Sequence, residues 1–274
     1  MHDVVRDVAM TIASNLHYAF VVRFDKLNDW PEKYQLRIYT SISLRLSNIG
    51  RLPEGMDFPS LEFFCFANNE FSFTIPDNFF EGMSGLKLED TAMIGELKNL
   101  KVLSLLATDI KQLPRAIGQL TQLQLLDLGN CSKLEVIPPN VLSNFKKLEE
   151  LNMENSFSGW ESEEANSEDI NANLRELNCL PELNTSDIRI RDPSAMPMDL
   201  LFKKLERYKI LIGDVWNWFG NYKTSRTLKL KINMSFHLVQ GILRLLERVE
   251  DLHLDELSSV KNVLYELNQK DFHI

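Results

Sequence analysis

The sequence predicts an α/β solenoid, in which short parallel strands lie side by side in one curved sheet. Three observations support this fold class. An apolar pattern of the form L-x-x-L-x-L recurs along the 274 residues, its clearest copies begin 23 and 25 residues apart, and Pro114 and Pro138 stand at the same place in two successive copies. Because proline breaks helices, this placement argues against the alternative of an ordinary α/β domain with leucine-rich helices.

The repeated unit explains how such a sheet forms. Its clearest copies begin at Leu100, Leu123 and Leu148, and the opening of the pattern returns at Val249. Side chains alternate along a strand, so both leucines of L-x-L enter the core and the residues between them face outward. The spacing is typical of leucine-rich repeats, whose coils bury their apolar side only by stacking, and about eight or nine strands are expected. The second core residues of the copies are Leu46, Phe66, Leu105, Leu128, Met153, Ile188, Ile210, Leu230 and Leu254.

A small polar residue follows three positions after the second core residue. At this place the chain turns away from the strand, and backbone groups of neighbouring coils need hydrogen-bond partners. We expect the small side chain to supply them. The residues at this place are Asn69, Thr108, Cys131, Ser156 and Asn233.

An acidic stretch interrupts the repeat between Met153 and Ile188. Residues 149–169 contain eight acids and no Lys or Arg. Such a composition favours solvated chain over packed structure. The stretch therefore predicts a loop inserted between coils near residues 157–173, with its acidic part 161–169 mobile and solvated.

Two further irregularities weaken the pattern. The interval from Phe66 to Leu105 is too long for one coil and too short for two, which leaves a stunted coil at 85–88 or a lost repeat. Ser186 stands where a core leucine is expected, so its coil has a weak point.

Composition excludes several classes of function. The formal net charge of -9 opposes nucleic acid as a partner, because phosphate binding needs a basic surface. Cys65, Cys131 and Cys179 are too widely spaced for a zinc site or a disulfide framework, which favours a reducing, cytoplasmic location. No apolar run is long enough to span a membrane. Catalytic and metal-binding motifs are absent from the sequence, so neither an enzyme nor a metal site is expected.

The N-terminal segment follows a different pattern. Apolar residues between Val5 and Leu16 recur at helical spacing, and residues 18–24 are apolar enough for a short strand. A segment of this length rarely folds alone, so it either caps the solenoid or ends a different module. The predicted division is residues 1–35 and residues 36–274, the second part being the repeat domain with the acidic loop.

The beginning of the chain, Met1-His2-Asp3 followed by Val-Val-Arg-Asp-Val-Ala, resembles the MHD motif of plant intracellular nucleotide-binding leucine-rich-repeat disease resistance proteins of the coiled-coil class. Three segments are similar to the repeats of that family: IGELKNLKVLSL, LPRAIGQLTQLQLLDLGNCSKLEVIPPNVLSNFKKLEELNM and KLERYKILIGDVWNW. The resemblance covers most of the chain. It implies that residues 1–35 are the winged-helix end of the nucleotide-binding (NB-ARC) module, and that the chain is a C-terminal fragment.

The resemblance also implies a cofactor site. In the family, the motif's histidine approaches the β-phosphate of bound ADP, a role that maps onto His2 with Asp3 as its support. This sequence contains no G-x-x-x-x-G-K-[ST] phosphate loop. We therefore expect the chain alone to bind neither ADP nor ATP, with the motif a vestige.

The residues between the core leucines are expected to form a concave face on which a partner docks. Along the coils this face changes from apolar to acidic, then basic, then acidic, although a solvated face of mixed charge is equally compatible with the pattern. The acidic loop is expected between the acidic and basic strips, where it would control access. The predicted contact residues are Asp127, Glu150, Glu154, Arg189, Lys209, Lys229 and Lys231.

Three functions compete. The family resemblance implies the sensor region of an immune receptor, which binds a pathogen effector or a guarded host protein and restrains the nucleotide-binding module. A substrate-recruiting leucine-rich-repeat adaptor of a ubiquitin ligase is the alternative, but residues 1–35 are short for the helical segment it requires. An extracellular receptor ectodomain is opposed by the missing signal peptide and cysteine-pair caps.

Overall fold

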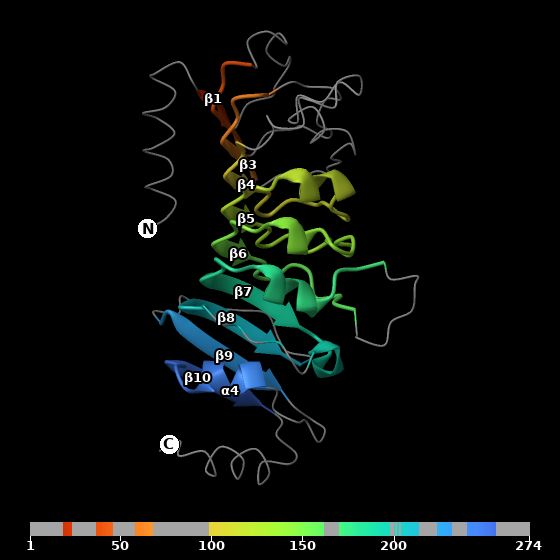
Figure 1. Ribbon diagram of the computed structural model, residues 1–274, viewed down its shortest axis with the longest axis vertical. Coiled ribbons are helices and arrows are strands. Elements are labelled where there is room, and N and C mark those ends of the chain that lie inside the picture. The colour runs from red at the N-terminus through yellow and green to blue at the C-terminus, as the bar shows by residue number, and fades with distance from the viewer. Residues whose placement is uncertain are drawn as a thin grey trace.

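Ten parallel strands form one open sheet, in which each strand pairs with its neighbours in chain order (Figure 1). The computed structural model describes residues 19–23, 37–45, 58–67, 99–161, 170–197, 200, 202, 204–213, 224–231 and 240–255. The predicted solenoid is confirmed, with more strands than the eight or nine expected. The strands are β1 (Ala19–Arg23), β2 (Ser41–Arg45), β3 (Phe63–Ala67), β4 (Val102–Ser104), β5 (Leu125–Asp127), β6 (Glu150–Asn152), β7 (Thr185–Ile190), β8 (Arg207–Ile212), β9 (Arg226–Lys231) and β10 (Asp251–Asp255).

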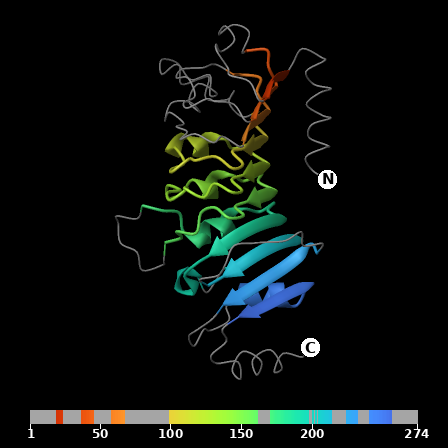
Figure 2. The same cartoon turned by 180° about the vertical axis from the view of Figure 1, so that it is seen from behind.

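Short helices cover one side of the sheet. The 3-10 helices η2 (Arg115–Gln119), η3 (Leu142–Asn144) and η4 (Leu174–Cys179) stack behind β4 to β7, as Figures 1 and 2 show from opposite sides. Helices η5 (Pro193–Ala195) and α4 (Gln240–Leu246) follow in later coils. A coil of this length leaves room for only about one helical turn after its strand and bends, so the returning chain is compact. The opposite side of the sheet, here called the open face, carries no described helix.

The core lies between the sheet and these helices. Leu103, Leu126 and Leu151 stand opposite one another on β4, β5 and β6, and all three are fully buried. Leu128 and Met153, two residues further along their strands, are buried as well. The core positions predicted from the repeat in these coils are confirmed.

Three predicted positions were in the wrong register. Leu44, not Leu46, pairs with Phe66, and Leu228, not Leu230, pairs with Ile210. Leu252, not Leu254, aligns with Leu228, and Leu254 is 38% exposed. These segments alternate apolar and polar residues over more than one period, so the pattern fits two registers equally well. The hydrogen bonds of the sheet select one register, and a shift of two residues keeps the same face buried.

The predicted polar position is confirmed in three coils. The hydroxyl of Thr108 donates to the carbonyl of Leu105 at 2.8 Å, and the thiol of Cys131 donates to the same carbonyl from the next coil at 3.0 Å. The hydroxyl of Ser156 donates to the carbonyl of Cys131 at 3.3 Å. The bonds of Cys131 and Ser156 link successive coils where the chain leaves the strand, and that of Thr108 closes the turn within its own coil. Asn69 and Asn233 lie outside the described residues.

The acidic insertion near residues 157–173 is anchored at both ends. Phe157 and Trp160 are buried with their rings in edge contact at 5.2 Å between centroids, and the Trp160 indole donates to the carbonyl of Arg189 at 2.8 Å. On the other side of the insertion Ala172 is fully buried. Two aromatic side chains inside an acidic stretch supply this anchor. The central residues 162–169 lie outside the described part.

The long interval before Leu105 adds no strand to the sheet, because β3 pairs directly with β4. Residues 68–98, including 85–88, lie outside the described part. The expected strand at 18–24 is confirmed as β1, which pairs with β2 in the same sheet. The helix expected between Val5 and Leu16, together with His2 and Asp3, lies outside the described residues, and the division at residue 35 stays a prediction.

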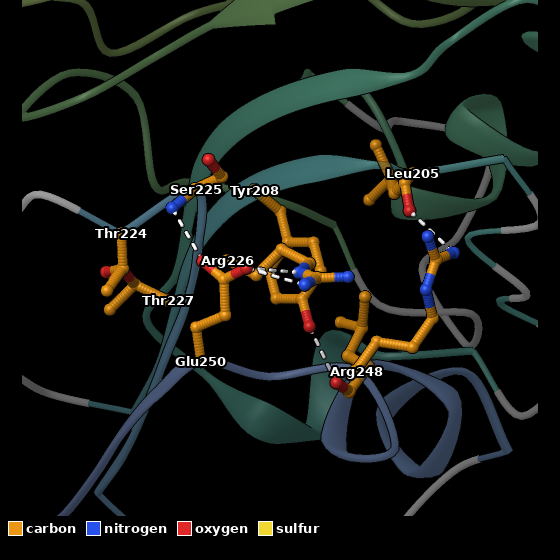
Figure 3. A network of polar contacts seen from close by, with 9 residues as sticks. Leu205, Tyr208, Thr224, Ser225, Arg226, Thr227, Arg248 and Glu250 are labelled. Carbon is orange, nitrogen blue, oxygen red and sulfur yellow. Dashed lines mark hydrogen bonds and ion pairs between the residues drawn. The ribbon is translucent and has the colours of Figure 1, made fainter.

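A polar network ties the last strands together (Figure 3). Glu250 accepts hydrogen bonds from the Arg226 guanidinium at 3.1 Å and from the backbone N–H of Ser225 at 2.9 Å, and these bonds hold its pKa below the ordinary range. The buried Tyr208 hydroxyl donates to the carbonyl of Leu245 in α4 at 2.6 Å. Burial raises the pKa of Tyr208 to about 12, so the hydroxyl remains a donor at physiological pH.

Candidate binding face

The open face is built from side chains that alternate with the core residues along each strand. Hydrogen-bond register aligns them into rows that cross the sheet. The central row begins with small or polar residues that are nearly or fully buried, and it becomes charged from β5 onward. Its members are Ser43, Cys65, Ser104, Asp127, Asn152, Asp187, Lys209, Thr227 and Asp251.

Asp127 lies in the floor of the face, with 8% of its surface exposed. The Ser104 hydroxyl donates to Oδ2 at 2.9 Å, while the Asn152 amide and the Gly129 N–H donate to Oδ1 at 2.9 and 3.1 Å. A Cβ on Gly129 would lie 3.0 Å from Asn152 Nδ2, so the glycine makes room for this network. Asp127 therefore shapes the floor and contributes negative charge from below the surface.

Three carboxylates gather beside this floor, at β6 and β7. Asp187 is the central one, and burial raises its pKa to about 6, with the charge of Lys209 opposing this shift and those of Glu154 and Glu150 adding to it. The nearest counter-charges come from β8, where Lys209 Nζ lies 3.7 Å from Asp187 and the Arg207 guanidinium lies 3.9 Å from Glu150. The acidic residues Glu150 and Glu154 predicted from the sequence are thus brought together.

The predicted basic residues do not form a separate strip. Asp187 stands next to Lys209, and Arg189, two residues further along β7, pairs in register with Leu211. Because of the register shift in β9, Lys229 also aligns with Leu211 rather than with Lys209, and it is buried. Lys229 and Lys231 each have a polar or electrostatic partner. Acidic and basic groups therefore interleave on β7 to β9.

Sequence reasoning missed three residues of this face, Ser104, Asn152 and Arg207. Ser104 and Asn152 donate to Asp127, and these bonds depend on the register between coils. Arg207 donates to the Thr185 hydroxyl at 3.2 Å and approaches Glu150 across an intervening strand. The insertion before β7 hides that relationship, because the repeat spacing is lost there.

The other end of the face is apolar. Phe63, Val102 and Leu125 align in register on β3, β4 and β5 and remain partly exposed. Leu106 lies on the other side of Ser104 from Val102, and its Cδ1 is 3.1 Å from the place of a Cβ on Gly129. The row of Leu125 continues on β6 with Glu150. The face thus changes from apolar to acidic between adjacent strands.

Both described ends of the acidic loop lie on the side opposite this face. The Glu161 N–H donates to the carbonyl of Ala172 at 3.1 Å, and the Asn173 amide donates to the carbonyl of Glu161 at 3.0 Å. Asn173 caps η4, so these ends lie beside the 3-10 helices (Figure 1). Residues 162–169, which were expected to rise between acidic and basic strips, lie outside the described part.

Other kinds of site were sought in the same part of the chain. Among the described residues, no group of three or more His, Cys, Asp or Glu side chains is placed to hold a metal ion. Within the same ranges, no helix is long and apolar enough to cross a membrane. Cys65 and Cys131 are buried thiols, whereas Cys179 is an exposed one.

Comparison with known families agrees with the strand arrangement. The model of the leucine-rich repeat region family matches residues 86–274. The chain belongs to this family. The leucine-rich repeat assignment is also consistent in fold with a chain of the Drosophila Toll–Spatzle complex, which is 16% identical with a TM-score of 0.51 over 84% of this chain and 28% of that chain.

The leucine-rich repeat chain is similar to two curated proteins of Arabidopsis thaliana. It is 29% identical to the disease resistance protein At4g27190 over 46% of this chain and 13% of that protein. It is 29% identical to the probable disease resistance protein At1g12290 over 56% of this chain and 19% of that protein. The chain therefore corresponds to less than a fifth of the length of either relative.

Proposed function

We propose that this chain is the ligand-recognition region of a plant disease resistance protein. The observation that carries the proposal is the open face, where a rigid parallel sheet holds an apolar row next to a charged one. Side chains on strands lose little conformational entropy when a partner binds, which favours recognition of a protein surface. The similarity to two disease resistance proteins supports the role in defence.

The proposed partner is a pathogen effector or a host protein that the receptor guards. Glu150, Glu154 and Lys209 of the contact set are partly exposed, while Asp127 and Lys229 lie in the floor. Arg189 and Lys231 complete the set. In a longer receptor the same region would also restrain a nucleotide-binding module, to which ADP binding would belong. The free thiols of Cys65, Cys131 and Cys179 support a cytoplasmic location.

Proximity labelling in plant cells tests this function. The chain would be fused to a labelling enzyme in three forms: wild type, Leu125→Glu on the open face, and Glu135→Lys on the exposed opposite side. We expect a set of proteins that the wild type and the Glu135 variant label and the Leu125 variant does not. Identical sets for all three forms would refute docking on the open face, and selective labelling of ubiquitin-ligase subunits would favour the adaptor alternative.

Nucleotide binding gives a second, independent test. Calorimetric titration of the chain with ADP should show no saturable heat, since the sequence carries no phosphate loop. Tight ADP binding would overturn the view that His2 and Asp3 are a vestige in this chain.

A further inference from the structure

We propose that the open face selects a polypeptide segment with two apolar side chains followed by a Lys or Arg, spaced as Φ-x-Φ-x-(Lys/Arg), where Φ is an apolar residue. The segment lies across β3 to β7, its apolar side chains on the row Phe63, Val102 and Leu125, and its cation among Glu150, Glu154 and Asp187. This inference rests on the proposed function, because it names the chemistry of the partner at the same face.

The apolar end provides the first contact. Phe63, Val102 and Leu125 occupy the same register on three adjacent strands, so they form one continuous row without a polar interruption. All three are partly exposed, and covering them with apolar side chains would remove that surface from water.

The acidic end provides the second contact. Glu150 continues the apolar row on β6, and Asp187 and Glu154 lie close enough for their charges to interact. Lys209 and Arg207 approach this group only from the β8 side, at 3.7 and 3.9 Å. The side that faces the apolar row holds Asp127, a further carboxylate, in the floor. A cation from a partner would enter from this side.

The electrostatics of Asp187 disfavour its charged form. Its pKa is raised to about 6 although Lys209 lies beside it, because burial and the charges of Glu154 and Glu150 outweigh that lysine. A carboxylate in this situation gains from an additional positive neighbour. An anionic partner such as a nucleic acid or a phosphorylated peptide would experience the opposite effect.

The spacing of the motif follows from strand geometry. Adjacent strands lie about 4.8 Å apart, so β3 and β6 are separated by about 14 Å. An extended peptide rises about 3.3 Å per residue, so four residues cover about 13 Å. A side chain at position i over β3 therefore places position i+4 over β6, where the acidic group begins. Position i+2 falls between β4 and β5, over Val102 and Leu125.

A library of random 12-residue peptides displayed on phage tests the inference with the full chain as the target. Parallel selections use the wild type, Leu125→Glu, Glu154→Lys and the matched control Glu135→Lys, which makes the same charge change on an exposed side chain on the helix-covered side of the sheet. Circular dichroism and thermal unfolding confirm that every variant is folded. Affinities of the enriched peptides are then measured at low and high salt.

We expect the wild type and the Glu135 variant to enrich peptides with two apolar residues followed by Lys or Arg. Replacing that Lys or Arg by Ala should weaken binding by roughly two- to fivefold, as for a partly exposed ion pair, and less at high salt. The Glu154 variant should shift the preference toward Asp or Glu at the same position, and the Leu125 variant should lose binding.

Two outcomes separate this inference from the proposed function. Enriched peptides that depend on Leu125 but show no preference for a cation would overturn the motif and leave the open face as the docking surface. Peptides that bind the Leu125 variant and the wild type equally tightly would overturn both the motif and docking on the open face. The absence of any enriched peptide would overturn both as well.

Discussion

Lys209 and Asp187 face each other across β8 and β7, with Nζ 3.7 Å from the carboxylate oxygen. The pair occupies the central row of the open face, between Asn152 on one side and Thr227 on the other. Despite this contact, burial keeps the pKa of Asp187 near 6, well above its ordinary value of 3.8. The buried charge of Asp187 thus costs folding free energy at neutral pH, and it marks the place where a partner's charge would be felt.

Asp187→Asn should therefore stabilise the protein at pH 7. The folded state holds the Asp187 proton more tightly than the unfolded state does, so this residue's contribution favours folding at pH 4 and weakens as pH rises from about 4 to 6. The variant should be more stable at pH 7 by about 1–3 kcal/mol, with little difference at pH 4. Urea unfolding at both pH values measures this, with Glu206→Gln as an exposed control. Parallel stability–pH curves for the wild type and the Asn variant would contradict it.

Ser186→Ala is expected to stabilise the protein for a different reason. Ser186 replaces a core leucine between Leu151 and Tyr208, is fully buried, and its hydroxyl has no hydrogen-bond partner in the described part of the chain. Removing an unsatisfied buried hydroxyl should raise the free energy of unfolding by about 1 kcal/mol.

The matched control for Ser186 is Ser104→Ala, on β4 and on the open face of the sheet. Ser104 is also buried, but its hydroxyl donates to Asp127 at 2.9 Å. Its loss should lower the free energy of unfolding by about 1.5–3 kcal/mol, as for a hydrogen bond to a charged group. Chemical denaturation of both variants distinguishes them, and a shift of the same sign in both would count against this explanation.

Trp160→Ala should release the anchor of the acidic insertion. The substitution removes a nearly buried ring that contacts Phe157 and donates to the carbonyl of Arg189 at 2.8 Å. The cavity and the lost hydrogen bond should lower the free energy of unfolding by about 3–5 kcal/mol. Limited proteolysis near the insertion should also become faster. Ile170→Ala, at a side chain 64% exposed, serves as the control and should change stability by less than about 0.5 kcal/mol.

Gly213→Ala should disrupt the turn that ends β8. The glycine has a φ of +100°, and a Cβ there would lie 2.0 Å from the carbonyl oxygen of Lys231. Backbone strain and the steric clash together should lower the free energy of unfolding by more than about 2 kcal/mol. Thermal or chemical unfolding measures this change. Gly159→Ala is the comparison, since its nearest new contact is the Asn171 side chain at 3.3 Å. Equal effects at the two glycines would show that the turn tolerates a side chain.

The sequence by itself determined the repeat, the buried leucines of β4 to β6, and the polar position filled by Thr108 and Cys131. These features depend on residues within one coil, where the alternation of side chains leaves a single arrangement. The sequence also indicated the charged character of the open face around Glu150 and Glu154. Local periodicity was sufficient in each case, because neighbouring coils repeat the same environment.

Only the tertiary structure decided how distant coils align. Leu228 and Leu230 fit the core pattern equally well, and the choice between them came from hydrogen bonds to β8. That choice separated Lys229 from Lys209, and the pairing of β7 with β8 placed Lys209 beside Asp187. The anchoring of the insertion by Trp160 was hidden in the same way, since its partner, Arg189, lies beyond the insertion. The free energy of strand pairing depends on residues far apart in the sequence. An insertion removes the periodicity from which the pairing could be inferred from sequence alone.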